Sequence, residues 1–321
     1  GDEVLIPSLC WSTSLYPIIQ MGLKPIFVDV SLATLNIDLN KIEKSITKKT
    51  KALMLIHALG NCANMKLLKK LLNRKKILLI EDCCEALGSK FNNQLLGTFG
   101  RVSTFSFYFS HHITSGEGGL VTCKSKQDYL ILLSLRSHGW SREIDAYNKN
   151  KNESFNRLFN FINLGYNLRL TDIQAALLYN QIGKINEYYK NRNYNYKKIY
   201  NKIMEDKILR LNIHLIKDIS TNQISWFNFP IILKSLKNYQ RDQICYKLNQ
   251  LGIETRPIIS GDFSKQKVIK RFYSSIPNKD SLNVLKINQS GFMIGISSRK
   301  LTVKKINKLI LDLKRALKQF L

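Results

Sequence analysis

The sequence contains few acidic residues and no apolar run long enough to cross a bilayer. Its 321 residues include 50 Lys and Arg against 23 Asp and Glu, which gives a formal net charge of +27. So strong a positive charge can indicate a nucleic-acid-binding protein, but the lysines are scattered, and no helix-turn-helix, zinc-finger or stacking motif accompanies them. We therefore expect no nucleic-acid partner. Without a run of about 20 apolar residues we also expect no membrane partner.

The six cysteines include no C-x-x-C pair, and Cys83 and Cys84 are adjacent, which is a poor spacing for structural zinc. We expect no metal site, and buried free thiols in a reducing cytosol. The first residues, Gly1-Asp-Glu3, are acidic and lack the basic segment of a signal peptide, so a cytoplasmic location is predicted. No methionine begins the chain, so its start is expected to be missing.

Short apolar segments alternate with helical patterns in the first half of the chain. This alternation predicts an α/β fold whose mainly parallel sheet is covered on both faces. The predicted strands are Glu3–Ile6, Pro25–Val30, Ala52–Ile56, Ile77–Ile80, Val102–Phe107 and Gly119–Cys123. The predicted helices lie near Leu15–Met21, Leu39–Ser45, Met65–Leu72 and Gln127–Arg136.

The second half has a different pattern. Residues 144–160 are rich in Asn and Lys without a clear period, which predicts an exposed loop. Thr171-Asp-Ile-Gln174 has capping-box spacing and begins a helical stretch that is expected to reach about residue 204, with breaks. A smaller unit follows, with predicted strands at 225–233 and 291–296, a helix at 239–251 and a closing helix from residue 303.

Two regions of the first half indicate chemistry. The buried-strand run Ile77–Asp82 ends in two acids, and in parallel sheets ligands gather at the carboxyl ends of strands. Asp82 there can pair with a cationic ring nitrogen, or it can cap the following turn. The run Phe105–Gly119 contains two adjacent histidines, and there is no lysine between residues 91 and 123. Imidazole can move protons near neutral pH.

Six motifs in order resemble those of the DegT-type sugar aminotransferases, which are fold-type I enzymes that use pyridoxal 5'-phosphate (PLP). They are Gly1-Asp-Glu-Val-Leu-Ile-Pro7, Ile56-His-Ala-Leu-Gly60, Glu81-Asp-Cys-Cys-Glu-Ala86, Gly97-Thr-Phe-Gly100, Gly165-Tyr-Asn-Leu-Arg-Leu-Thr-Asp-Ile-Gln-Ala-Ala176 and Gly252-Ile-Glu-Thr-Arg-Pro257. The resemblance implies a large cofactor-binding domain at 1–185, without the N-terminal stretch that family members carry. It also implies a smaller α+β domain at 186–321.

Within that family the chain is most similar to the dehydratases that remove the C3 hydroxyl of GDP-linked 4-keto-6-deoxymannose. The likeness rests on Trp11-Ser-Thr13, Thr34-Leu-Asn-Ile-Asp38, Leu59-Gly-Asn61, Ser110-His-His-Ile113, Arg136-Ser-His-Gly-Trp140 and Ser225-Trp-Phe227. It implies PLP and its amine form, pyridoxamine 5'-phosphate (PMP), as cofactors, with L-glutamate restoring PMP. Related CDP-sugar enzymes use an iron–sulfur cluster, but this chain has no group of four cysteines for one.

The resemblance also implies roles for five residues around the cofactor. Asp82 would pair with the pyridine nitrogen, and Glu85 would lie near the ring hydroxyl. Trp11 would stack on the ring, and Ser106 would contact the phosphate. Asn167 would reach the phosphate of the neighbouring subunit, which implies a homodimer.

The histidines carry the expected chemistry. Ungapped counting from Phe105 places His111 where aminotransferases have their covalent lysine, and His112 is the alternative base. His138 would either reach the substrate or cap a helix, and Arg256 would contact substrate. Elsewhere, His57 and His214 are expected to be structural. Two rival functions stay open: an aminotransferase with a relocated lysine, and a binding protein of the same fold without catalysis.

Overall fold

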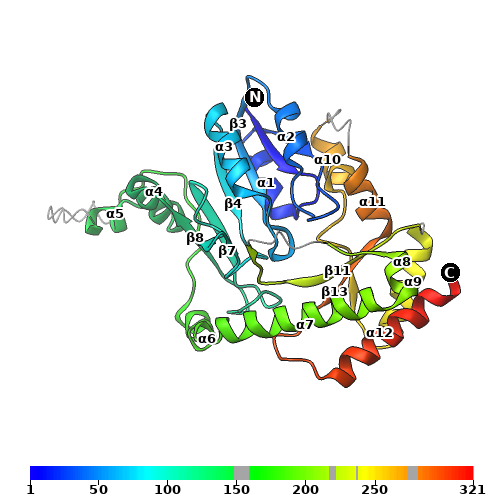
Figure 1. Cartoon of the computed structure of the whole chain (residues 1–321). Coiled ribbons are helices and arrows are strands. Elements are labelled where there is room, and N and C mark those ends of the chain that lie inside the picture. The colour runs from blue at the N-terminus through cyan, green and yellow to red at the C-terminus, as the bar shows by residue number, and fades with distance from the viewer. Residues whose placement is uncertain (148–158, 217–221, 236–237, 274–280, 321) are drawn as a thin grey trace.

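The fold is centred on a six-stranded sheet in the order β2-β1-β3-β4-β7-β8, called here the large sheet (Figure 1). The computed structural model describes residues 1–147, 159–216, 222–235, 238–273 and 281–320. The strands are β1 Glu3–Pro7, β2 Lys24–Val28, β3 Thr50–Ile56, β4 Leu78–Asp82, β7 Val102–Ser106 and β8 Gly119–Cys123. All neighbours are parallel except β7 and β8. The predicted α/β fold with a mainly parallel sheet is confirmed.

Alternating side chains place two apolar layers on the large sheet. In β1, Val4 and Ile6 join the cluster on one face, whereas Leu5 joins the cluster on the other. Helices α1 (Ser12–Gln20) and α10 (Lys267–Phe272) supply residues to the first cluster. Helices α2 (Leu39–Ser45) and α3 (Met65–Lys75) supply residues to the second. Both faces of the sheet are therefore covered, as its continuous apolar strands require.

The next segment contains more helix than expected. The predicted loop at 144–160 is wrong at its start, because Arg142–Tyr147 forms helix α5, and residues 148–158 lie outside the described part. The capping box is confirmed: the Thr171 hydroxyl accepts from Gln174 N at 3.3 Å, and Thr171 N donates back at 3.0 Å. The helices here are α4 Lys126–Arg136, α6 Asp172–Ile182, α7 Ile185–Glu205 and α8 Lys207–Asn212.

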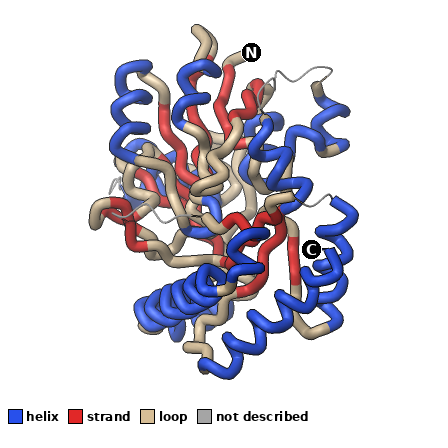
Figure 2. Tube along the Cα trace, turned by 45° about the vertical axis from the view of Figure 1, so that its right-hand side comes forward, coloured by secondary structure: helices blue, strands red, loops and turns tan. Residues whose placement is uncertain are grey.

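The second half forms a four-stranded antiparallel sheet in the order β12-β13-β11-β9, called here the small sheet (Figure 2). Its strands are β9 Ile213–His214, β11 Asn228–Leu233, β12 Thr255–Arg256 and β13 Gly291–Gly295, with helices α9 Asn238–Gln250, α11 Leu282–Ser290 and α12 Val303–Leu317. The strand predicted at 225–233 starts only at Asn228. Residues 222–227, called here the crossing segment, leave the small sheet. Two of them form β10 (Asn222–Gln223), which pairs with β5 (Lys90–Phe91) beside β6 (Gln94–Leu95).

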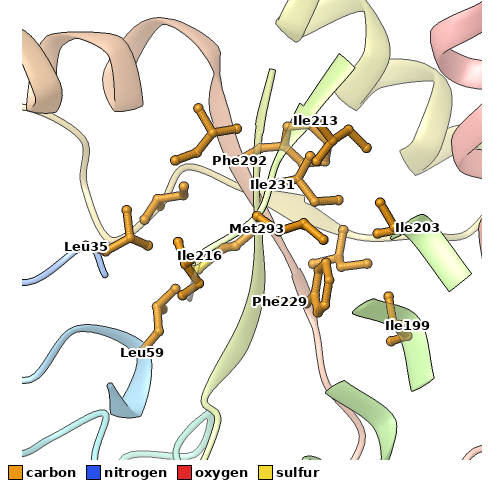
Figure 3. Packing of buried hydrophobic residues seen from close by; sticks show 14 of the residues in the cluster. Leu35, Leu59, Ile199, Ile203, Ile213, Ile216, Phe229, Ile231, Phe292 and Met293 are labelled. Carbon is orange, nitrogen blue, oxygen red and sulfur yellow. The ribbon is translucent and has the colours of Figure 1, made fainter. Parts of the chain in front are cut away.

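One apolar cluster joins the two sheets. It contains Leu35 and Leu59 from the first half together with Phe229 and Met293 from β11 and β13 (Figure 3). The predicted domain boundary after residue 185 falls at the start of α7, and the division into two domains stays a prediction. Among the helices of the described ranges, none has both the length and the apolar character for a bilayer crossing.

Asp29 also connects the two halves, because it lies in the first half and caps helix α11 of the second half. Its buried carboxylate accepts from Asn283 N and Val284 N, at 3.1 and 2.8 Å, in the first turn of α11. Ser281, which directly precedes α11, makes no capping hydrogen bond with its side chain. Lys41 Nζ contacts the same carboxylate at 2.9 Å. Asp29, which directly follows β2, therefore caps α11 in place of a local N-cap residue.

Replacing Asp29 with Ala should lower the free energy of unfolding by about 3 kcal/mol, because two buried N–H groups and a lysine lose their partner. Asp38→Ala is the matched control. Asp38 caps α2 through one bond to Asn40 N, so its loss should cost about 1 kcal/mol. Urea unfolding of both variants measures the difference. Equal losses would contradict a connecting role for Asp29.

Candidate active site

A cavity of about 1050 Å³ opens at the carboxyl ends of the large-sheet strands. Ile56, Asp82 and Ser106, which end β3, β4 and β7, line its inner wall. The opposite wall comes from the second half of the chain and includes Phe227, Asn228, Arg256, Met293 and Gly295. This is the edge at which parallel α/β sheets bind ligands.

Asp82 lines the cavity, and two donors hold its carboxylate. Ser14 Oγ donates to one oxygen at 2.6 Å, and Cys84 N donates to the other at 3.0 Å. The second of these is the turn-capping bond of the simpler interpretation, so both interpretations of Asp82 fit the structure. No role was predicted for Ser14, although it follows Trp11-Ser-Thr13 and lies in the first turn of α1.

Glu85 also lines the cavity wall, three residues after Asp82. Burial raises the pKa of Glu85 to about 7; a hydrogen bond from Leu59 N at 2.8 Å acts against this, and the charge of Asp82 adds to it. Near neutral pH this side chain therefore exists in both its acid and its carboxylate forms. It can offer a proton to a ring oxygen or accept one from it.

His111 lines the cavity, whereas the adjacent His112 does not. Burial lowers the pKa of His111, while a hydrogen bond with the Cys84 backbone and the charge of Asp82 act against that shift. The Phe227 ring stacks on the imidazole, with centroids 5.0 Å apart and planes at 28°. His111 is thus a neutral base at neutral pH.

His112 is buried beneath the cavity, and its Nε2 lies 2.9 Å from the Ser225 carbonyl oxygen. Burial, followed by the charge of Arg192, lowers the pKa of His112 to about 3. A neutral imidazole beside a carbonyl must donate from Nε2–H. The structure therefore separates the two predicted catalytic histidines, with one in the cavity and the other bonded to the crossing segment.

The other predicted residues divide into two groups. Trp11, Ser106 and Arg256 line the cavity, and Trp11 is 56% exposed there. His138 and Asn167 do not line it. His138 packs against Trp140, and the exposed Asn167 pairs with Ser137 outside the cavity of its own chain. Phe227 also lines the cavity and belongs to the motif Ser225-Trp-Phe227, but no role was predicted for it.

A second polar cluster is buried at the end of β4. Its residues, His57, Glu81 and Cys83, do not line the cavity. His57 Nε2 contacts Glu81 at 2.8 Å, and Cys83 lies within 4.8 Å of both side chains. This spacing could suit a metal ion. However, the Glu81 carboxylate already accepts three backbone N–H groups from residues 97–100. That donor set gives His57 and Glu81 a structural role, holding the Gly97–Gly100 turn.

The cavity fits a pyridine-ring cofactor held without a covalent bond. Trp11 presents an exposed aromatic face, Ser106 offers a hydroxyl at a strand end, and each oxygen of Asp82 keeps a lone pair for a ring N–H. Among the described residues that line the cavity there is no lysine. The donor set therefore matches the ring, but it lacks the amine that would tether it.

Comparisons with known proteins agree with this geometry. A family model described as the DegT/DnrJ/EryC1/StrS aminotransferase family matches residues 1–287. The chain is 34% identical to the GDP-4-keto-6-deoxy-D-mannose 3-dehydratase of Escherichia coli O55:H7, over 92% of this chain and 76% of that protein. Two solved structures of GDP-4-keto-6-deoxymannose 3-dehydratase superimpose with a TM-score of 0.90. One, from E. coli, contains hydrated PLP (34% identity, 98% and 80% covered). The other contains a trapped PLP-glutamate geminal diamine (33% identity, 98% and 81% covered).

Replacing His112 with Gln should make the free energy of unfolding less dependent on pH. The pKa of His112 is about 3 in the folded chain against 6.5 ordinarily, so between these values only the unfolded chain binds the proton. Folding stability due to this group therefore falls by about 1.4 kcal/mol per pH unit below about pH 6.5. Gln keeps a donor for Ser225 but does not titrate.

Urea unfolding at about pH 7.5 and about pH 5.5 measures this difference, and the wild type should lose about 1.4 kcal/mol more than the variant. All other titrating groups are shared by the two proteins and cancel. Equal losses would mean that His112 is protonated as easily in the folded chain as in the unfolded one.

Proposed function

The chain belongs to the DegT/DnrJ/EryC1/StrS aminotransferase family, and on that premise we propose that it is a PMP-dependent 3-dehydratase of a nucleotide-linked 4-keto-6-deoxyhexose. GDP-4-keto-6-deoxymannose is the substrate that we propose first, because the similar dehydratases are named for it. One observation carries the proposal: His111 occupies the cavity beside Asp82, and no lysine is among the described residues that line it.

Four residues would hold the cofactor. Asp82, fixed by Ser14, would pair with the protonated ring nitrogen, and Trp11 would cover one face of the ring. Ser106 would donate to the phosphate. Glu85, whose pKa is about 7, would share a proton with the ring hydroxyl. When bound, PMP supplies an amine for the C4 ketone of the sugar and a ring that takes up negative charge.

His111 would then move the protons. As a neutral imidazole it can remove a proton at the C4′ carbon of the cofactor, and as imidazolium it can protonate the C3 oxygen of the sugar as that group leaves. Arg256, exposed at the cavity wall, offers guanidinium donors to an anionic diphosphate. In sum, the sugar would lose its C3 oxygen as water, hydrolysis would release the nitrogen as ammonia and leave the cofactor oxidised to PLP, and L-glutamate would restore PMP as it becomes 2-oxoglutarate.

The aminotransferase alternative requires an amine that can reach the same cofactor atom. An imidazole cannot take the place of that amine as a covalent tether, but it retains the acid–base function. A binding protein without catalysis would not need a base with lowered pKa in the cavity that Asp82 also lines. Both observations favour dehydration. The six cysteines are free thiols, which supports our proposal of a reducing, cytoplasmic location.

Replacing His111 with Asn should lower the rate of dehydration by at least about 100-fold, because it removes the only proposed proton carrier. PMP should still bind, since Asp82, Trp11 and Ser106 are unchanged. The assay is incubation with PMP and GDP-4-keto-6-deoxymannose, followed by mass spectrometry of the sugar. Loss of one oxygen reports dehydration, and gain of an amine reports transamination.

His214→Gln is the matched control, because this half-buried histidine bonds to the Leu32 carbonyl, and it is not among the cavity-lining residues. It should leave turnover unchanged. The assignment fails if His111→Asn retains turnover. The proposed function fails if the wild type leaves the sugar intact or aminates it.

We also propose a homodimer, because a second copy of the chain would cover an exposed apolar face next to Asn167. Apolar residues on segment 159–170 and helix α6 are 38–96% exposed, far more than a monomer normally presents in one region. They are Phe159, Phe161, Ile162, Leu164, Tyr166, Leu168, Leu170, Ile173, Leu177, Tyr179 and Ile182. Burial of this face would also bring Asn167 towards the partner's cavity.

The double substitution Leu164→Asp and Ile173→Asp should produce monomers, because it places two charges in the proposed interface. PMP affinity should fall about tenfold, since a hydrogen bond to a charged phosphate contributes about 1.5–3 kcal/mol. Analytical ultracentrifugation and calorimetry measure the two effects. Leu282→Asp is the control, as it lies 75% exposed at the start of α11. A monomeric wild type would refute the dimer.

A further inference from the structure

We propose that the crossing segment holds His111 in its working orientation, with Phe227 as the ring that positions the imidazole and His112 as the anchor of the segment. This inference rests on the proposed function only in naming His111 as the base. The other observations concern contacts of this chain alone. They make Phe227 and His112 positioning residues rather than catalytic ones.

The first observation is that the crossing segment is bonded to the first half of the chain at several residues. Its strand β10 pairs with β5 through Gln223 and Lys90. Ser225 N donates to Ser89 Oγ at 2.9 Å, and the Ser225 carbonyl receives the bond from His112. All three contacts come from residues far away in the sequence, so the position of the segment is set by tertiary structure.

The second observation is the close approach of Gly60. Its φ of +87° is disfavoured for other residues, and a Cβ there would lie 2.2 Å from the Ser225 carbonyl oxygen. The backbone of residue 60 therefore supports the same carbonyl that His112 binds. Neither group leaves the segment room to move towards the first half of the chain.

The third observation is that hydrogen bonds fix the backbone of Phe227 through both its N–H and its carbonyl group. Its N–H donates to the Leu59 carbonyl at 3.0 Å, and its own carbonyl accepts from Arg192 at 2.8 Å. The preceding Trp226 is 2% exposed and stacks on Tyr196, with centroids 3.7 Å apart. A ring held in this way can restrict the imidazole on which it stacks.

The fourth observation explains why the adjacent His112 does not repel a proton from His111. His112 is buried, donates to Ser225 and stays uncharged, so it places no positive charge beside His111. The Phe227 ring contacts both imidazoles, at 5.0 Å from His111 and 5.6 Å from His112. Removing that ring should expose His111 to water and let it rotate.

Phe227→Leu tests the ring, and Phe227→Tyr is its conservative partner. In Phe227→Leu we expect turnover to fall about tenfold, because misplacement of an acid–base group by about 1 Å can cost up to 100-fold. The pKa of His111 should rise towards 6.5, which moves the acid limb of the pH–rate profile to higher pH. Phe227→Tyr should restore both values.

The pKa of His111 is measured without substrate or cofactor, by NMR titration of protein carrying ¹³C-labelled histidine. The chain has five histidines, so His111→Asn assigns the signal by its loss. If the His111 titration and the pH–rate profile are the same in Phe227→Leu as in the wild type, the positioning role is wrong. Because this titration needs no turnover, it separates failure of the inference from failure of the proposed function.

The anchor is tested by a pair of substitutions. His112→Gln keeps a donor for the Ser225 carbonyl and should retain turnover within about threefold, whereas His112→Leu should reproduce the His111 titration of Phe227→Leu. If His112→Gln abolishes dehydration as His111→Asn does, His112 is itself an acid–base group and the anchor role is wrong. If His112→Leu does not fold, His112→Gln and Phe227→Leu still decide.

Discussion

The structure depends on the burial of the crossing segment between the two sheets. Trp226 lies in the apolar cluster that also contains Leu59 from the first half and Phe229 from β11. Truncating a buried Trp typically costs about 3–5 kcal/mol, more than any single polar contact at this junction would contribute. The apolar cluster therefore contributes most of the free energy that stabilises this junction. The hydrogen bonds of residues 222–227 determine which residues of the two halves lie opposite one another. Without that junction the cavity would have only one wall.

The place of Asp82 in the first wall of the cavity could be predicted from sequence, because it ends a buried-strand run, whereas Ser106 was identified only through the resemblance. Asp82 and Ser106 end neighbouring parallel strands, so their side chains must meet at one edge of the sheet. The same logic explains why most predicted strands and helices of the first half were found. The resemblance added roles for these residues, and their placement in the cavity fits those roles.

The second wall could not be predicted in this way, because its contacts join residues far apart in the chain. Ser225, for example, is 113 residues from His112. No local pattern encodes such a distance. The sequence pattern alone also could not tell which of His111 and His112 faces the cavity. Residues 108–115 form an irregular turn, in which side chains follow neither the strand period nor the helix period. The strand predicted from residue 225 failed because its first residues cross to the other sheet.

The cavity combines groups that burial affects in opposite ways. Burial raises the pKa of Glu85 and lowers the pKa of His111, because in each case it disfavours the charged form. Both groups thus approach neutrality at the pH at which a cell works, while the neighbouring Asp82 keeps two hydrogen-bond donors. A base that is uncharged before the reaction can accept a proton without first losing one. The Phe227 ring stacks on the imidazole of His111 and so contributes to the burial that lowers the pKa of His111. The acid–base state of His111 and its orientation therefore have one structural origin.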